Sequence, residues 1–186
     1  MQYPRELKVL PVAAQRRGRP PIGFGLQVAD GLGVELPESA NQPLVRCTEA
    51  TASRTIGVLE VDVFAAGMVV DPEGALQQIA SAALDRLRGG GTARARPPTA
   101  FELDDGVHGI RVHADLLRDG TGQRPALPYL TVVALAGVSV RGGVIVTMAS
   151  AAANWEAGDR VLDSLRVLDR DRAGGRGGMP MPITGG

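Results

Sequence analysis

The sequence contains few of the residues on which catalytic and metal sites usually depend. It has a single cysteine, Cys47, so it can form neither an intramolecular disulfide nor a four-cysteine zinc site. Lys8 is the sole lysine among twenty basic residues, which argues against chemistry based on a lysine nucleophile or a phosphate-binding lysine. The two histidines, His108 and His113, are five residues apart in a predicted strand and therefore point to opposite faces. We expect no catalytic centre, cofactor or metal from this inventory.

Aromatic residues, net charge and long apolar runs are equally scarce. Six aromatic side chains are too few for a surface that stacks on nucleic acid bases, and the formal net charge is zero. No run approaches the eighteen or so apolar residues of a transmembrane helix. Near the N-terminus, basic residues follow the short apolar run 9–14, the reverse of the charge order in a signal peptide. We expect a cytoplasmic protein with no nucleic acid partner and no transmembrane segment.

The length and the distribution of charge predict one domain with two soft ends. A chain of 186 residues is the size of a single domain. Residues 1–22 hold five basic side chains, one acidic side chain and four prolines, which favours a flexible basic arm with little regular structure. Residues 23–168 are acidic overall and form the predicted α+β domain. Residues 169–186 are rich in glycine and predict a disordered tail.

Two helices are expected. Asp71 followed by Pro72 is typical of a helix start, and the glycines 89–91 of a helix end. Between them, apolar residues recur at spacings of three and four and form one stripe: Leu76, Ile79, Ala80, Ala83, Leu84 and Leu87. A second helix is predicted over residues 154–168, with Asn154 as its N-cap. Its inward-facing residues are Trp155, Val161, Leu162, Leu165 and Leu168.

Most of the remaining apolar residues follow strand patterns. Alternating or β-branched blocks predict four strands over Thr55–Phe64, His108–Leu116, Tyr129–Val138 and Val144–Met148. Weaker patterns predict three more over Phe24–Val28, Gly33–Leu36 and Leu44–Thr48. Residues 141–143 lie between the last two strong blocks, and their paired glycines predict a tight antiparallel hairpin. Strands grouped in runs rather than alternating with helices indicate the α+β class, an antiparallel β-sheet with helices packed on it.

Several residues could carry a function, and each also has a plainer interpretation. Arg111, His113 and Asp115 share one face of their strand, either as a recognition patch or as a solvated face. Glu60 and Asp62 point the same way, which suits a bound cation but equally a half-exposed strand. Cys47 fits a small buried side chain better than a nucleophile. The sequence contains no nucleophile elbow, zinc-protease motif, phosphate-binding loop or dinucleotide-binding fingerprint.

The strand predicted over Tyr129–Val138 is apolar on both of its alternating faces. Such a strand either lies in the core or presents an apolar surface to a partner, by edge pairing or helix capture. Tyr129, at its start, and Trp155, before the last helix, are added to the candidate binding residues, together with Arg111, His113 and Asp115.

The C-terminal half resembles the Mog1/PsbP-like superfamily, which includes bacterial domains and actinobacterial lipoproteins. The resemblance lies in the order of a strand containing Gly109–Arg111, a hairpin, then Asn154 and Trp155, and a closing helix with the step Leu162, Ser164, Leu165. It covers mainly residues 50–168. The N-terminal part departs from the family, because the sequence Leu36, Pro37, Glu38 lacks the tryptophan of the family's usual opening element.

The resemblance implies an α/β/α sandwich and a role in binding proteins rather than in catalysis. Members of the superfamily act as adaptors, chaperones for secreted effectors, photosystem subunits and binders of small GTPases. We therefore expect a non-enzymatic adaptor or chaperone-like module with a protein partner, linked in one version to bacterial secretion or the cell envelope. If the apolar strand 129–138 binds a second copy of the chain instead of another protein, the result would be a homodimer. The alternative is a small-molecule-binding protein or enzyme with a site between sheet and helix.

Overall fold

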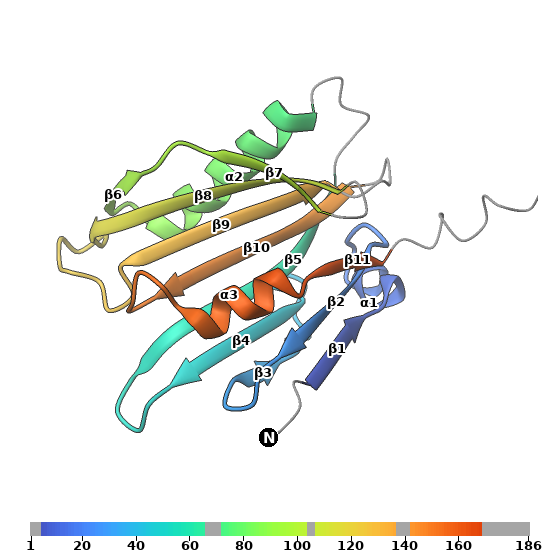
Figure 1. Ribbon diagram of the computed structural model, residues 1–186, viewed down its shortest axis with the longest axis horizontal. Coiled ribbons are helices and arrows are strands. Elements are labelled where there is room, and N and C mark those ends of the chain that lie inside the picture. Colours follow the sequence, from blue (N-terminus) through green and yellow to red (C-terminus); the bar gives the residue numbers. More distant parts are fainter. Residues whose placement is uncertain (1–4, 66–71, 104–106, 137–141, 169–186) are drawn as a thin grey trace, which may run out of the picture.

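The described part of the chain folds into two antiparallel β-sheets and three helices (Figure 1). This computed structural model describes residues 5–65, 72–103, 107–136 and 142–168. The larger sheet has eight strands in the order β3-β4-β5-β10-β9-β8-β6, and β7 pairs with the other end of β8. These strands are β3 (Gly33–Glu35), β4 (Val45–Ala50), β5 (Thr55–Ala65), β6 (Thr92–Ala95), β7 (Thr99–Leu103), β8 (Val107–Arg118), β9 (Tyr129–Ala136) and β10 (Gly142–Ser150).

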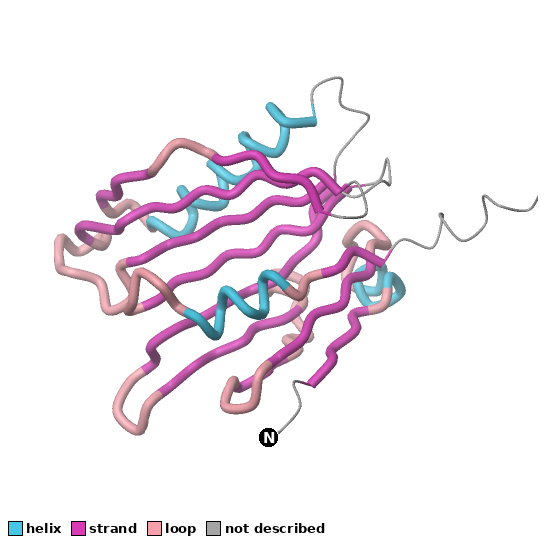
Figure 2. Tube along the Cα trace, viewed as in Figure 1, coloured by secondary structure: helices cyan, strands magenta, loops and turns pink. Residues whose placement is uncertain are grey.

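The smaller sheet has three strands in the order β1-β2-β11. They are β1 (Arg5–Val9), β2 (Gly23–Val28) and β11 (Arg166–Leu168). The helices are α1 (Pro11–Arg16), α2 (Pro72–Arg88) and α3 (Glu156–Asp163). Figures 1 and 2 show α2 on one face of the larger sheet and α3 on the opposite face, next to the smaller sheet. The predicted α+β sandwich is therefore confirmed.

Two hydrophobic cores lie on the two faces of the larger sheet. The apolar stripe of α2 packs on side chains of β8 and β9 such as Ile110 and Val132. On the other face, α3 and the smaller sheet enclose a larger core with β4, β5 and β10, in which Phe24 is fully buried. Alternation along each central strand supplies both cores at once, because successive side chains point to opposite faces.

Helix α2 agrees closely with its prediction. It begins at Pro72, and the predicted stripe is buried or packed against the core; Asp71 lies outside the described residues. Gly89 and Gly90 follow the helix with φ of 54° and 81°, a backbone conformation that favours glycine.

The prediction of one helix over residues 154–168 is wrong at both ends. Helix α3 begins at Glu156, with Trp155 rather than Asn154 at the N-cap position, and ends at Asp163. After a turn, Arg166–Leu168 pairs with β2 as strand β11. A short apolar step at the end of an amphipathic helix does not reveal a strand partner that lies some 140 residues earlier.

The prediction that residues 1–22 lack regular structure is wrong for the described residues 5–22. Strand β1 pairs along its whole length with β2, and α1 follows it directly. Proline at the first position of α1 loses no helical hydrogen bond, so Pro11 starts this helix rather than preventing it. Val9, Ala14 and Ile22 are buried in the larger core. The segment is therefore part of the folded body.

Two basic side chains of this segment, Arg17 and Arg19, are bound to other parts of the molecule. Arg17 donates hydrogen bonds to the carbonyl oxygens of Ser39, Gln42 and Pro43. Arg19 donates to Gln42 and forms an ion pair with Asp62, with 2.9 Å between Nε and Oδ1. The carbonyl oxygens of the loop 39–43 thus bind two of the arginines whose charge led to the prediction of a free basic arm. Residues 169–186, the predicted tail, lie outside the described residues.

Strands β9 and β10 form the predicted antiparallel pair, but two glycines assigned to the turn belong to β10. Gly142 pairs with Ala65, and Gly143 with Ala136 and Phe64; Arg141 lies outside the described residues. A Cβ on Gly143 would overlap the carbonyl oxygen of Leu135, so glycine here allows close backbone approach. Strand β9 lies between β8 and β10 and has no free edge, so the core interpretation of residues 129–136 holds over the exposed-strand one.

Candidate functional site

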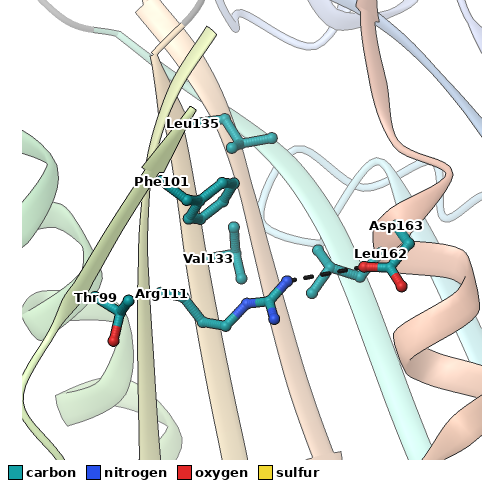
Figure 3. Close-up of a pocket in the computed structure, with 7 residues that line it drawn as sticks. All are labelled: Thr99, Phe101, Arg111, Val133, Leu135, Leu162 and Asp163. Carbon is teal, nitrogen blue, oxygen red and sulfur yellow. Dashed lines mark ion pairs between the residues drawn. The ribbon is translucent and has the colours of Figure 1, made fainter. Parts of the chain in front are cut away.

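One hollow on the α3 side of the larger sheet contains the predicted residue Arg111. It is a half-open cavity of about 310 Å³ between strands β7–β9 and the end of α3 (Figure 3). We call it the Arg111 groove; its lining residues are Thr99, Phe101, Arg111, Val133, Leu135, Leu162 and Asp163. Except for Thr99, Arg111 and Asp163, these side chains are apolar. The groove therefore combines an apolar floor with one cation and one carboxylate.

Arg111 reaches the groove because alternation along β8 turns odd-numbered residues toward α3. Its guanidinium carbon lies 5.5 Å from the centre of the Phe101 ring, within the range of a cation–π interaction. Its Nη2 atom is 3.9 Å from Oδ1 of Asp163, too far for a hydrogen bond. The Nε atom is buried and has no hydrogen-bond partner. The guanidinium is thus positioned by packing rather than consumed by internal hydrogen bonds.

Phe101 owes its position to a glycine on the neighbouring strand. In the register of β7 and β8, Phe101 lies opposite Gly109. A Cβ on Gly109 would overlap the Phe101 ring and lie 2.8 Å from Leu135 Cδ2. The absence of a side chain at this position lets the ring lie over the backbone of β8 beside Arg111. Neither β6 nor β7 was predicted from the sequence, so Phe101 was not among the predicted site residues.

His113 and Asp115 continue the polar face of β8 beyond the groove. Nδ1 of His113 forms a hydrogen bond of 2.9 Å with Oγ1 of Thr131. Burial lowers the pKa of His113, and the charges of Arg111 and Arg96 lower it further. The imidazole is therefore neutral at pH 7. Within the described residues, no hydrogen bond joins His113 to a carboxylate, as an acid–base relay would require.

The structure separates the two aromatic candidates. Tyr129 is half-buried at the start of β9 and lies opposite Asp115, at the far end of the same face from the groove. Trp155 is 7% exposed and lies in the larger core. Its indole ring packs on Gly57 and Gly158, and its N–H donates to the carboxylate of Glu49. Trp155 therefore has a structural role, and it does not line the groove.

The carboxylates of Glu60 and Asp62 lie on the same face, as predicted, but each has an arginine partner. Arg46 donates to Glu60 through both Nε and Nη2, at 2.8 and 2.6 Å. Burial raises the pKa of Asp62, while the N–H of Val63 and the charge of Arg19 oppose that change. These pairs account for both carboxylates. Among the described residues, no group of three or more metal-ligating side chains lies together.

Cys47 is fully buried between Val34 and Leu59 on the neighbouring strands. Burial raises the pKa of its thiol to about 11. A thiol with this pKa is protonated at neutral pH and cannot act as a nucleophile. The interpretation of Cys47 as a small buried side chain is therefore confirmed.

The thiol gives the protein a specific dependence on alkaline pH. Because the thiol has a higher pKa in the folded state, the unfolded chain loses this proton at a lower pH than the folded chain does. The contribution of Cys47 to the free energy of unfolding is therefore fully present below about pH 8.5 and is lost as the pH rises toward the folded-state pKa. We expect the free energy of unfolding to fall by about 3 kcal/mol between pH 8.5 and pH 11 through this group. Denaturant titrations of the wild type and of Cys47→Ala at several pH values in this range give the free energy of unfolding of each. The effect is the difference between the two proteins in the slope of this free energy against pH. Equal slopes would contradict the prediction.

Comparison with known proteins agrees with the fold. No known family's sequence profile matches the chain, and no curated protein sequence does. Among solved structures, the Ran-binding protein Mog1p of Saccharomyces cerevisiae is similar, with a TM-score of 0.53 and 12% identity over 90% of this chain and 98% of that one. A mutant of protein Mog1 gives a TM-score of 0.53 and 12% identity over 92% and 99%. The chain thus has the predicted Mog1/PsbP-like fold. No helix among the described residues is long and apolar enough to cross a membrane.

Proposed function

We propose that this chain, which has the Mog1/PsbP-like fold, is a non-enzymatic adaptor that binds another protein through the Arg111 groove. The observation that carries the proposal is incomplete cover on one face of the larger sheet. Helix α3 and the smaller sheet pack over β4, β5 and β10, whereas the groove over β7–β9 stays open beside α3. An open hollow with an apolar floor and a cation at its wall is typical of a protein-binding surface.

The similar proteins support a protein partner at a coarse level. Mog1p is described as a Ran-binding protein, and it shares this fold over nearly its whole length. Such a fold gives no shared catalytic motif, so the proposal depends on the groove of this chain rather than on any transferred residue. A chaperone-like role, and a link to bacterial secretion or the cell envelope, remain predictions from the family resemblance.

The alternative function, a small-molecule-binding protein or enzyme, places its site in the same position between sheet and helix. The volume of about 310 Å³ is at the lower end of the range for ligand pockets, and the hollow is open on one side. Such a hollow encloses less of a free ligand than most binding sites do. Its size and openness suit one or two side chains of a partner better.

Site-specific photocrosslinking in the producing cells tests the proposal. A photoreactive phenylalanine derivative at Thr99, an exposed position on the groove wall, should crosslink to one protein in stoichiometric amounts. The matched control places the same group at Gln78, which is exposed on α2, on the opposite face of the sheet. Crosslinks from Gln78 but not from Thr99 would overturn the proposal. A crosslink to a second copy of this chain would instead support homodimerisation, and light scattering would confirm it.

A further inference from the structure

We propose that the Arg111 groove recognises a partner segment in which a carboxylate side chain stands next to a large apolar side chain. This inference rests on the proposed function and specifies the chemistry of the partner. The carboxylate would bind the guanidinium of Arg111, and the apolar side chain would occupy the floor formed by Val133, Leu135 and Leu162.

The guanidinium of Arg111 has donors to spare. Among the described residues, its one ionic contact is with Asp163, at 3.9 Å, and Nε is buried with no acceptor there. The Arg111 side chain is 35% exposed, so an incoming acceptor would bind the accessible end of the guanidinium rather than the buried Nε. Figure 3 shows the guanidinium extending from β8 across the groove toward α3, so its end is presented between the two walls. A planar fork of donors is suited to a carboxylate, which accepts two parallel hydrogen bonds.

The two walls of the groove carry opposite charges. Arg111 is the charged residue that β8 contributes to the lining of the groove; beyond it, Arg96 lowers the pKa of His113 and Asp115 raises it. On the helix side, Asp159 raises the pKa of the same histidine, and Asp163 ends α3. A carboxylate is therefore attracted to the strand wall and repelled by the helix wall. This asymmetry gives the bound segment one preferred orientation.

The apolar floor requires the second half of the motif. Val133, Leu135 and Leu162 are almost completely buried, and Phe101 closes one end of the hollow. An acidic group alone would leave the partly exposed ring of Phe101, and the hollow above this floor, in contact with water. A leucine- or phenylalanine-sized side chain next to the carboxylate would displace that water, and its removal would also strengthen the ion pair.

Selection from a phage-displayed library of random short peptides tests the chemistry directly. The enriched peptides should contain Asp or Glu adjacent to Leu, Ile, Phe or Met. A synthetic peptide of the enriched sequence should bind Arg111→Gln at least about tenfold more weakly than the wild type. The control Arg54→Gln, at the exposed turn between β4 and β5, should bind it with unchanged affinity. Asp163→Asn should bind it more tightly, by about twofold to fivefold, because a competing carboxylate is removed.

Three results would overturn the inference in distinguishable ways. Peptides that bind in the groove without an acidic residue, or with equal affinity for Arg111→Gln, would refute the acidic motif and leave the proposed function standing. The proposed function itself fails together with the inference if no peptide is enriched. It also fails if the enriched peptides do not reduce crosslinking of the protein partner to the photoreactive group at Thr99. Binding of free leucine or a free short-chain carboxylate as tightly as the peptide would refute a protein partner and support the small-molecule alternative.

Discussion

Replacing Trp155 by alanine should lower the free energy of unfolding by about 3–5 kcal/mol. The indole is 7% exposed and bridges α3 to strand β5, where it packs on Gly57. Truncation would leave a large cavity and would also remove the donor to Glu49. Since small domains are stable by about 5–15 kcal/mol, this single change consumes much of the total. Guanidinium unfolding followed by circular dichroism measures it, because the variant has no tryptophan fluorescence.

A matched control and a double-mutant cycle make this prediction specific. Leu117→Ala removes a large apolar side chain that is 50% exposed, and we expect a change within about 0.5 kcal/mol. Gly57→Ala should also destabilise the wild type, because its Cβ would overlap the indole. In the Trp155→Ala background the same methyl group has room, so the two losses should not add. Additive losses, or a loss below about 1 kcal/mol for Trp155→Ala, would contradict the assigned packing.

Removal of residues 1–22 should abolish cooperative folding, with a loss of more than about 5 kcal/mol. This deletion takes away β1, the neighbour of β2, and three buried apolar side chains: Val9, Ala14 and Ile22. It also leaves Asp62, a part-buried carboxylate, without the arginine that pairs with it. Thermal unfolding followed by near-ultraviolet circular dichroism measures the effect.

The control for this deletion keeps the backbone and changes only the charges. Arg17→Ala together with Arg19→Ala should destabilise the protein less than the deletion and leave unfolding cooperative, because β1 and α1 remain. A truncated protein that melts cooperatively near the wild-type temperature would show that the segment is dispensable.

This role of residues 1–22 in folding affects how a binding partner can be mapped. A partner lost on deletion of residues 1–22 would not identify that segment as the contact, since the groove itself depends on the fold.

The local sequence pattern predicted those elements in which a regular spacing of apolar residues continues over many residues, or whose neighbours in the fold are close in the sequence. The stripe of α2 and the alternation of β5 and β8 were sufficient, because each element buries one regular face. Strand β11 was missed because its three residues acquire their structure from β2, a partner distant in the sequence. Strand β1 was missed although its partner β2 is the next strand in the sequence, because the four prolines and five basic residues of the segment 1–22 concealed it.

The candidate site was predicted in part. The period of two placed Arg111, His113 and Asp115 on one face, and the structure keeps them on the face that α3 partly covers. Phe101 and Asp163 could not be found in this way, because they come from β7 and α3 and meet Arg111 only in the folded chain. Gly109 left one local signal, a glycine interrupting a β-branched strand, which often marks close approach of another group.

The position of β2 between β1 and β11 has a consequence for synthesis on the ribosome. Strand β2 leaves the exit tunnel long before β11, and its buried side chains Phe24 and Leu26 then have one strand partner instead of two. The second partner, residues 166–168, is made some 140 residues later. At translation speeds of about 5–20 residues per second, this strand edge therefore stays uncovered for about 7–28 seconds. A nonsense codon before residue 166 would make this exposure permanent, because residues 166–168 would never be made.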